Sequence, residues 1–319
     1  MTERPDQSPI TSPRSERVRK VAALTGRSAR RKQGRFRVEG PQSVRSLLAH
    51  RPALALEVHL TERAAEAHPE LERLAREAEV PVRLVDEQVL RAMVRESGPA
   101  DGSAAGGFAA DGAASSADGG TAVAGGARTG AAGALVSPQG VVAVGALPAE
   151  DPAAATAALK ALPAEGPLTV VVLHEVRDPG NVGTLIRTAD AAGADLVLLT
   201  RTSADPYSPK AVRATVGSLF HLPVLAGAEI APLLETLAAR GLIAAATSGR
   251  ASAELFDVEL PARIAWILGN EAHGLDGDTL AAAPLTVRIP LAGHAESLNV
   301  HTAATVCLFE TLRRRRAGA

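Results

Sequence analysis

A loop rich in glycine and polar residues follows an apolar segment in the second half of the chain. It comprises residues 174–187, HEVRDPGNVGTLIR, and leads into a segment whose apolar residues recur with helical spacing. Asn181 occupies the position of a helix N-cap, and Arg187 lies nearly two turns further on, away from the apolar stripe. An arginine placed there can bind a negatively charged partner. The loop is also compatible with a capped helix that carries a surface arginine.

Two further loops of the same kind follow apolar segments closer to the C-terminus. Residues 268–275 read LGNEAHGL, and two glycines enclose Glu271. Residues 289–300 read IPLAGHAESLNV and place Ser297 and Asn299 like cap residues at the start of another helix. Glycine lets the backbone approach a ligand closely, and carboxylate, hydroxyl and amide groups can orient one by hydrogen bonds. Each loop alone is also compatible with an ordinary turn.

Several common kinds of site lack the residues they need. The sequence has no Gly-Lys pair for a Walker loop, and no strand is followed by a Gly-x-Gly-x-x-Gly that opens a helix. It also has no Gly-x-Ser-x-Gly elbow for a hydrolase nucleophile. His294 and His301 have no third well-spaced ligand, and Cys307 is the only cysteine. We therefore expect neither a metal site nor a disulfide scaffold.

Positive charge is concentrated near the N-terminus although the net charge is only −1. Residues 14–37 contain ten arginines or lysines against one acid, and residues 313–316 are four consecutive arginines. Such a basic arm favours a polyanionic partner, and a solvated tail is the alternative. Aromatic residues are 2% of the chain, which argues against an aromatic platform for stacking bases. No apolar stretch is long enough to span a membrane, and no signal peptide is evident, so we expect a cytoplasmic protein.

The elements that must position the three loops alternate between strand and helix from residue 168 onward. The apolar runs predict strands separated by helices and followed by a last helix over about 298–314; the strands are expected at 169–173, 195–199, 242–246, 264–268 and 287–289. This alternation predicts a mostly parallel sheet with helices on both faces. Ligands of such sheets bind at the carboxyl ends of the strands, which is where the three loops begin.

The first half has a different organisation. We expect a disordered tail over residues 1–14, a small α/β domain over 15–146, a linker over 147–166 and the second domain over 167–319. Within the first domain, 25 of the 37 residues from 98 to 134 are Gly or Ala, without a hydrophobic period. This segment is predicted to be a flexible surface insertion, because it cannot bury a core of its own.

In their order and their placement after strands, the three loops resemble the three motifs of the SpoU/TrmH family, a branch of the SPOUT RNA methyltransferases. The matching segments are PGNVGTLIRTADAAGAD (179–195), ILGNEAHGL (267–275) and IPLAGHAESLNV (289–300). RRKQGRFRVEG (30–40) and SPQGVVAV (137–144) resemble the family's small substrate-binding domain, which is similar to a ribosomal-protein fold. The insertion departs from that domain.

The resemblance implies a Rossmann-like parallel sheet that ends in a deep trefoil knot, and transfer of a methyl group from S-adenosylmethionine to a ribose 2′-hydroxyl of RNA. It implies cofactor-binding roles for Thr247, Gly269, Ile289 and Leu298 and catalytic-site roles for Asn181, Arg187, Glu271, Ser297 and Asn299. The basic stretch leads into the substrate-binding domain, so we expect RNA contacts from Arg30, Arg31, Lys32, Arg35 and Arg37. The family also implies a homodimer.

Several alternatives stay open at this point. Ribosomal RNA is favoured as substrate over transfer RNA, and an RNA-binding protein that keeps the fold without catalysis is a further possibility. An NAD-dependent enzyme lacks its glycine fingerprint. Arg187 is either the general base or a phosphate clamp; the second is chemically simpler, because a guanidinium stays protonated. The apolar face of the last helix belongs either to a dimer interface or to the helix's own sheet.

Overall fold

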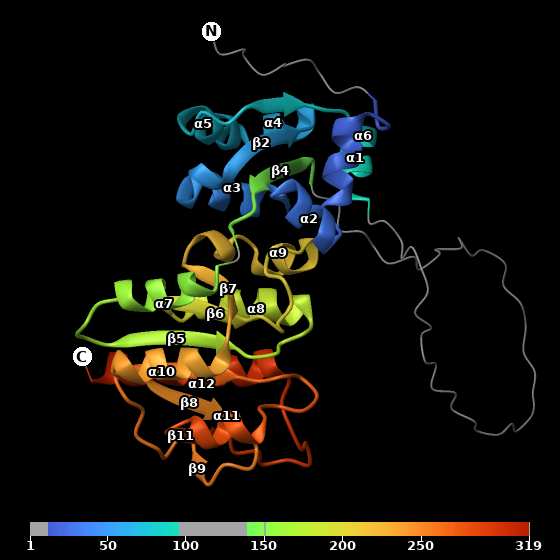
Figure 1. Ribbon diagram of the computed structural model, residues 1–319. Coiled ribbons are helices and arrows are strands. Elements are labelled where there is room, and N and C mark those ends of the chain that lie inside the picture. The colour runs from blue at the N-terminus through green and yellow to red at the C-terminus, as the bar shows by residue number, and fades with distance from the viewer. Residues whose placement is uncertain (1–11, 96–138, 150, 319) are drawn as a thin grey trace, which may run out of the picture.

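The computed structural model describes residues 12–95, 139–149 and 151–318. The predicted insertion over 98–134 lies outside these residues, as does most of the predicted tail. The described chain forms two α/β domains that are stacked on each other, with the N-terminal domain above the C-terminal one in Figure 1. Among the described residues, no helix combines the length and the apolar character needed to cross a membrane.

The N-terminal domain is built on a mixed four-stranded sheet. Its strands, in spatial order, are β1 (Arg35–Glu39), β4 (Val141–Ala146), β2 (Ala55–Leu60) and β3 (Val82–Leu84). Strand β4 is antiparallel to both of its neighbours, and β3 runs parallel to β2. The helices are α1 (Glu16–Ala23), α2 (Arg27–Gln33), α3 (Pro41–His50), α4 (Glu62–Ala67), α5 (Pro69–Glu77) and α6 (Glu87–Val94). Helices α4 and α5 are separated at His68, because Pro69 has no N–H to continue the hydrogen-bond ladder of α4.

Alternation along the strands gives this sheet two different faces. Phe36 and Val38 pack in the core that includes residues of α3 and α5, whereas Val142 and Val144 pack with α1 and α6. Charged side chains share the second face with the valines. Arg37, for example, is fully buried there and donates a hydrogen bond from Nη1 to the Met93 carbonyl of α6 (2.5 Å).

The C-terminal domain contains a seven-stranded sheet in which every pairing is parallel. This confirms the predicted Rossmann-like architecture. The spatial order is β7 (Val224–Ala228), β6 (Leu196–Thr200), β5 (Leu168–Leu173), β10 (Arg263–Leu268), β8 (Ile243–Thr247), β11 (Leu285–Arg288) and β9 (Ala253–Glu254). Strands β5 and β10 are buried along nearly their whole length, as their continuous apolar runs predict.

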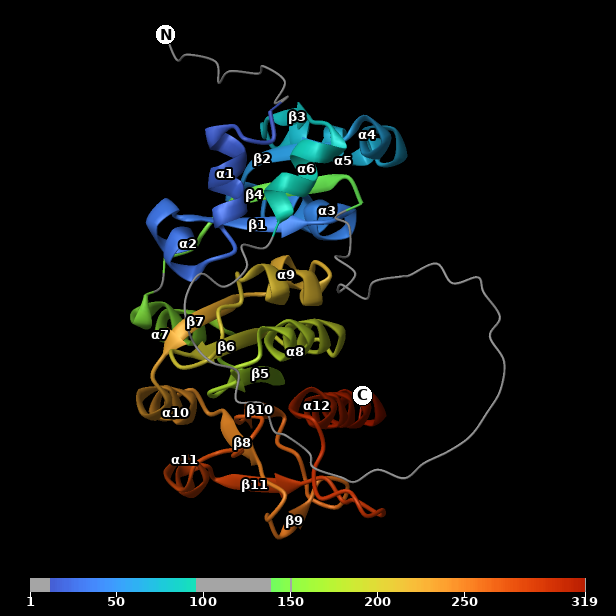
Figure 2. The same ribbon diagram turned by 90° about the vertical axis from the view of Figure 1, so that its right-hand side faces the viewer.

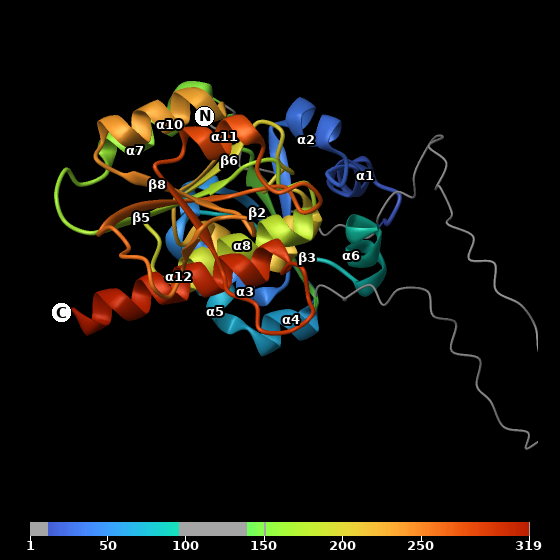
Figure 3. The same cartoon turned by 90° about the horizontal axis from the view of Figure 1, so that it is seen from below.

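Helices cover both faces of this sheet. Helices α7 (Pro152–Ala161), α10 (Ile230–Ala239) and α11 (Gly277–Ala282) lie on one side, and α8 (Pro179–Ala191), α9 (Pro209–Thr215) and α12 (Val300–Ala317) lie on the other (Figure 2). Seen from below, α12 runs beside α8 (Figure 3), and the two helices are in contact. The buried face of α12, with Ala304, Cys307 and Leu308, therefore packs within its own domain.

Helix α7 lies in the stretch expected to be a linker. Ala155 and Leu159 are buried in the core beneath α10, and Asp151 caps the helix by accepting a hydrogen bond from the Ala153 N–H (2.8 Å). Residues 152–161 thus belong structurally to the C-terminal domain. Several prolines in the segment suggested a linker, but a proline in the first turn of a helix is favourable.

The two domains share a buried interface. The Phe36 ring meets Tyr207 edge-on with a centroid distance of 4.9 Å, in a core that continues from one domain into the other. Arg213 of α9 donates to both carboxylate oxygens of Glu39 at 3.1 Å. Ser46 of α3 lies 3.1 Å from Nε2 of His221. These contacts fix the N-terminal domain on the end of the C-terminal domain that carries α9.

Arg30 and Arg37, two of the expected RNA-contacting residues, are part of this buried framework. Arg30 is 2% exposed; its Nη2 lies 2.5 Å from Asp205, and its Nη1 donates to the carbonyls of Leu24 and Thr25. Arg37 is 0% exposed and donates through Nε to Glu39 (2.8 Å). The prediction of direct RNA contact is therefore wrong for these two arginines, because their guanidinium groups face protein carboxylates and carbonyls.

Candidate functional site

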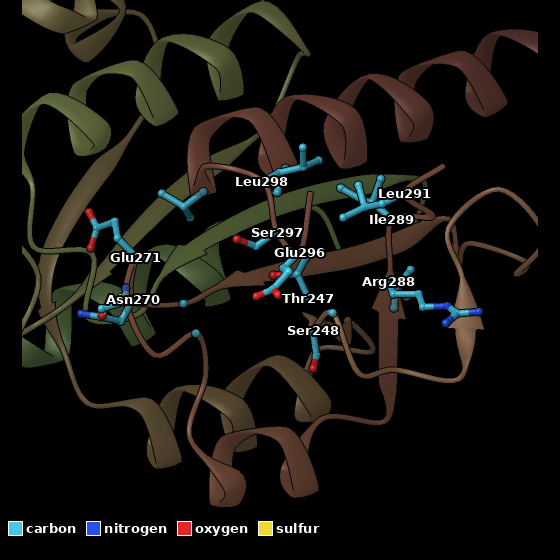
Figure 4. Close-up of a pocket in the computed structure, with 17 residues that line it drawn as sticks. Thr247, Ser248, Asn270, Glu271, Arg288, Ile289, Leu291, Glu296, Ser297 and Leu298 are labelled. Carbon is cyan, nitrogen blue, oxygen red and sulfur yellow. Dashed lines mark hydrogen bonds between the residues drawn. The ribbon is translucent and has the colours of Figure 1, made fainter. Parts of the chain in front are cut away.

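A cavity of about 240 Å³ lies at the carboxyl ends of β8, β10 and β11, and it is partly open to solvent. Thr247 ends β8, Gly269 follows β10, and Ile289 follows β11. Leu298 reaches the cavity from the segment that precedes α12. All four residues expected to bind the cofactor therefore line one cavity. Figure 4 shows Glu271 near one end of it and Arg288 near the other, with Glu296 and Ser297 between them.

Gly269 is required by the shape of the loop that it begins. Asn270 and Gly274 exchange two backbone hydrogen bonds (3.0 and 2.9 Å), which fold residues 269–274 into a tight turn. A Cβ atom on Gly269 would lie only 2.5 Å from the carbonyl carbon of Gly274. Because the clash would be with backbone, a side chain cannot be accommodated without moving the loop. The glycine therefore keeps the backbone of this turn at the wall of the cavity.

Glu271 connects this turn to the loop that follows β5. Its Oε1 accepts hydrogen bonds from the Asp178 N–H and the Asn181 Nδ2 (both 3.0 Å), and its Oε2 accepts one from the Arg177 N–H (3.1 Å). Burial alone would raise the pKa of this carboxyl group, but the three hydrogen bonds together hold the pKa below its ordinary value. Glu271 is thus an ionised acceptor that holds two motif loops together.

Asn181 is not the N-cap of α8, contrary to expectation. Asp178 caps the helix, and its Oδ1 accepts a hydrogen bond from the Asn181 N–H (2.9 Å). The reason is local: Pro179 favours the first position of a helix, which places the cap at Asp178. Lys210 of α9 donates to Asp178 Oδ2 (2.7 Å), and this bond is the main reason why the pKa of Asp178 is lowered. Asn181 itself turns its amide toward Glu271.

Arg187 is exposed on α8 and does not line the cavity. Within the described part of the chain it makes no hydrogen bond or ion pair, so its guanidinium is available to an external anion. The next residue, Thr188, lies 3.0 Å from His301 Nε2, which brings this turn of α8 against the first turn of α12. His301 is thereby engaged with a hydroxyl group, and the described residues contain no His, Cys, Asp and Glu group suited to a metal.

Asn299 and Ser297 lie next to each other at the start of α12 but have different surroundings. Asn299 caps the helix through its Oδ1, which accepts from the His301 N–H (2.8 Å), and this confirms its predicted position as a cap. Ser297 is exposed and lines the cavity. The structure therefore brings Ser297 and Glu271 to the cavity, with Asn181 bonded to Glu271. Arg187 and Asn299 are not among the residues that line it.

Two residues of the site were not singled out from the sequence. Asn270 donates from Nδ2 to the Glu175 carbonyl (2.9 Å) and accepts from the Ala272 N–H (2.8 Å), so it also joins the two loops. Asn270 could have been identified from the sequence, because it lies between Gly269 and Glu271, which were both expected at the site. Lys210 had no such signal, because it reaches Asp178 from a different helix.

Of the basic residues expected to contact RNA, three are exposed. Arg31 and Lys32 lie on α2, and Arg35 begins β1. Their exposure leaves RNA contact possible for them, in contrast to the buried Arg30 and Arg37.

Two family models match the chain. Residues 168–309 match the SpoU rRNA Methylase family, and residues 37–105 match the model for RNA 2'-O ribose methyltransferase substrate binding. The first match includes all three motif loops, two of which line the cavity. We refer to the C-terminal domain as the SpoU domain, after the family model that it matches. The match begins at β5, after helix α7 of the same domain, and the substrate-binding match covers β2, β3 and part of β1.

Two curated relatives of the SpoU domain are enzymes named for 23S rRNA. The guanosine-2'-O-methyltransferase RlmB of Pseudomonas syringae pv. tomato is 39% identical over 153 residues, which are 48% of this chain and 61% of that protein. The 23S rRNA (uridine(2479)-2'-O)-methyltransferase of Streptomyces viridochromogenes is 35% identical over 187 residues, which are 57% of this chain and 63% of that protein. The chain spans about three fifths of the length of these relatives.

Solved structures resemble both domains together. An AdoMet-bound rRNA methyltransferase from Sinorhizobium meliloti has a TM-score of 0.71 and 27% identity, covering 96% of this chain and 98% of that one. The SpoU methyltransferase AviRb from Streptomyces viridochromogenes, in complex with AdoMet, has a TM-score of 0.68 and 27% identity, covering 96% and 100%. These likenesses confirm the predicted α/β fold with its parallel sheet. The trefoil knot stays a prediction.

Proposed function

We propose that this chain transfers a methyl group from S-adenosylmethionine to a ribose 2′-hydroxyl of RNA, and that its substrate is ribosomal RNA. The observation that carries the proposal is the cavity at the ends of β8, β10 and β11, which all four expected cofactor residues line. The names of the 23S rRNA relatives and the AdoMet-bound solved structures support both the cofactor and the substrate class. The names of these two relatives do not mention transfer RNA.

The cavity fits S-adenosylmethionine in its chemistry. Its walls combine the backbone of the Gly269 turn with the apolar side chains of Ile289, Leu291 and Leu298. Backbone donors and acceptors can recognise an adenine without a charged side chain, and apolar side chains can enclose its ring. When bound, S-adenosylmethionine supplies an electrophilic methyl group. Thr247, Gly269, Ile289 and Leu298 are the residues proposed to hold it.

The protein's own contribution is to align the RNA 2′-hydroxyl with that group, and the proton that the hydroxyl loses passes to solvent. Arg187 is assigned to the RNA phosphate next to the target ribose, because it is exposed and lacks an internal partner among the described residues. A guanidinium can bind a phosphate through two parallel hydrogen bonds, whereas it is a poor proton acceptor. Ser297 at the cavity and Asn299 beside it are proposed to orient the ribose. Glu271 and Asn181 hold the loops in register.

We further propose that the protein acts as a homodimer in the cytoplasm. The inner face of α12 is buried in its own domain, so a dimer must use other surfaces. Phe309 on the outer face of α12 is 43% exposed, and Leu291 beside the cavity is 40% exposed. These two side chains are candidate members of such a surface, and the family resemblance supports the dimer itself. Sedimentation equilibrium of the full chain tests this proposal, and a monomer at micromolar concentration would contradict it.

The decisive experiment measures transfer of labelled methyl from S-adenosylmethionine to rRNA from cells that lack this protein. Nuclease digestion then identifies the modified nucleoside, which we expect to be 2′-O-methylated. Arg187→Ala should abolish transfer while S-adenosylmethionine still binds in a separate titration, and Arg201→Ala, which removes another exposed arginine of the same domain, should retain transfer. Near-normal turnover by Arg187→Ala would remove that residue from the mechanism.

The other outcomes separate the rival functions. Methylation of transfer RNA instead of rRNA would show that the proposed substrate class is wrong and that the reaction is correct. Absence of both transfer and cofactor binding in the wild-type protein would favour an RNA-binding protein without catalysis.

A further inference from the structure

A second cavity, of about 670 Å³, lies in the N-terminal domain, far along the chain from the residues of the transfer site. Helix α1 forms one wall, and the second face of the sheet forms the floor, with contributions from β1, β2, β3 and β4. A volume of this order is typical of sites that bind small molecules or single groups of a larger ligand. Nothing in the proposed transfer reaction uses this cavity.

Positive charge predominates at its walls. Arg17, Lys20, Arg35 and Arg83 line the cavity, against two acids. One of these, Glu16, is engaged with Lys20 in a surface ion pair (2.8 Å). Arg17 and Arg35 make no hydrogen bond or ion pair to any residue that the structure describes. Two unpaired guanidinium groups therefore border the same cavity.

Arg83 is the most informative of these residues. Its side chain is only 3% exposed, and its Nε lies 3.7 Å from Oε2 of Glu57, the second acid. Nε and Nη1 are buried and form no hydrogen bond within the described residues. A buried guanidinium that lacks hydrogen-bond acceptors is costly, and an anion in the adjoining cavity would supply them.

Apart from Gln33, the remaining lining is apolar. Val21 of α1 and Leu24 at the end of that helix face the cavity together with Leu56 of β2 and Val144 of β4, and Leu56 is 36% exposed. A ligand that suits this lining has a flat, weakly polar part and a negatively charged part. A nucleotide of single-stranded RNA has both, since its base can stack on guanidinium planes and apolar side chains while its phosphate accepts hydrogen bonds from arginine.

We propose that this cavity binds one phosphate-bearing nucleotide of the RNA substrate, and so forms a second RNA site in the domain that does not carry the transfer cavity. The proposal deepens the proposed function and rests on it for the identity of the RNA. It assigns RNA contacts to Arg17, Arg35 and Arg83, of which the basic stretch predicted only Arg35. The buried Arg30 and Arg37 instead hold the interface and the sheet.

The test uses the full chain and a fluorescein-labelled decauridylate, whose binding is followed by anisotropy at several salt concentrations. The Arg17→Ala/Arg35→Ala double variant is compared with Arg76→Ala/Arg91→Ala, which removes the same charge from exposed positions outside the cavity. We expect the first variant to raise Kd about tenfold and to reduce the slope of log Kd against log salt by about 1.4, the change for two lost contacts to single-stranded phosphates. The second variant should change neither quantity beyond its small effect on net charge.

Equal Kd and slope in the two double variants would overturn the proposal. Equally strong competition by a decaglutamate peptide would also overturn it, in favour of an acidic protein partner. The single variant Arg35→Ala, at an exposed position, provides a second measurement if the double variant melts at a lower temperature. Decauridylate binding needs no methyl transfer, so a wild-type protein that binds through this cavity but does not methylate rRNA refutes the proposed function alone.

Discussion

Replacing Glu271 by glutamine should test its role as the ionised acceptor that connects the two loops. The change keeps the size of the side chain but converts one carboxylate oxygen into an NH₂ group. Whichever oxygen is replaced, a donor then faces a donor: the Arg177 N–H on one side, or the Asp178 N–H and the Asn181 amide on the other. At least one of the three hydrogen bonds is therefore lost, and those that remain no longer have an ionised acceptor.

The size of the effect follows from the strength of these bonds. A hydrogen bond to a charged group contributes about 1.5–3 kcal/mol, and partial exposure of Glu271 places its bonds at the low end of that range. A loss of about 1.4 kcal/mol in the alignment of the two loops corresponds to roughly a tenfold lower rate of methyl transfer. The pKa of Glu271 is below its ordinary value, so the carboxylate is fully ionised at neutral pH. Its stabilising effect is lost only as the pH falls through that lowered pKa.

The assay measures kcat and KM for methyl transfer to rRNA, with S-adenosylmethionine affinity determined separately by calorimetry. Glu235→Gln, on the exposed surface of α10, is the matched control for the loss of one carboxylate. We expect Glu271→Gln to transfer methyl about tenfold more slowly with a nearly unchanged melting temperature. If Glu271→Gln and Glu235→Gln have the same activity, the connection between the two loops does not limit the reaction, and the reasoning is refuted.

Three other perturbations test the site and the fold. Gly269→Ala should weaken S-adenosylmethionine binding more than tenfold in calorimetry, because the added Cβ would lie 2.5 Å from backbone. Gly277→Ala is the control, since a Cβ there would have no atom within 4 Å. Equal affinities of the two variants would contradict the argument. Arg30→Ala should lower the free energy of unfolding by about 3 kcal/mol in urea titrations, since it leaves the opposite carboxylate without its buried partner. A change below about 1 kcal/mol would mean that this ion pair does not hold the domains together. Deleting residues 98–134 should leave the melting temperature and methyl transfer nearly unchanged, and loss of folded protein would show that the insertion is structural.

The parallel sheet could be predicted because its strands are buried on both faces. The runs that became β5, β6 and β10 are apolar at nearly every position, and such runs leave little choice of structure. Helix α7 was missed although Asp151 and Pro152 form a standard helix start, because the prolines around it suggested a linker. Strand β9 has only two residues and depends on pairing with β11, so no local sequence pattern predicts it.

Some site residues could likewise be identified from the local sequence, whereas the surroundings of others depend on residues far along the chain. Thr247 ends β8, Gly269 and Ile289 follow β10 and β11, and Leu298 lies between β11 and α12. The family resemblance implied these four residues, and their common cavity agrees with the rule that parallel sheets bind ligands at the carboxyl ends of their strands. The burial of Arg30 could not be predicted, because its partner Asp205 lies 175 residues further along the chain. A run of basic residues in a sequence gives its charge, but which of its members face solvent depends on the domain packed against it.

Some arginines of the basic stretch are buried and others are exposed, and this difference affects how the two domains recognise RNA. Arg30 and Arg37 join α2 and β1 to carboxylates, and Glu39 continues this network to Arg213 of the SpoU domain. The apolar core around Phe36 is also continuous across the interface. With charged and apolar contacts both buried there, the domains should move as one body. An RNA held at the proposed nucleotide cavity must then present its ribose to the transfer site at a fixed spacing, so the N-terminal domain would select substrates by geometry as well as by charge.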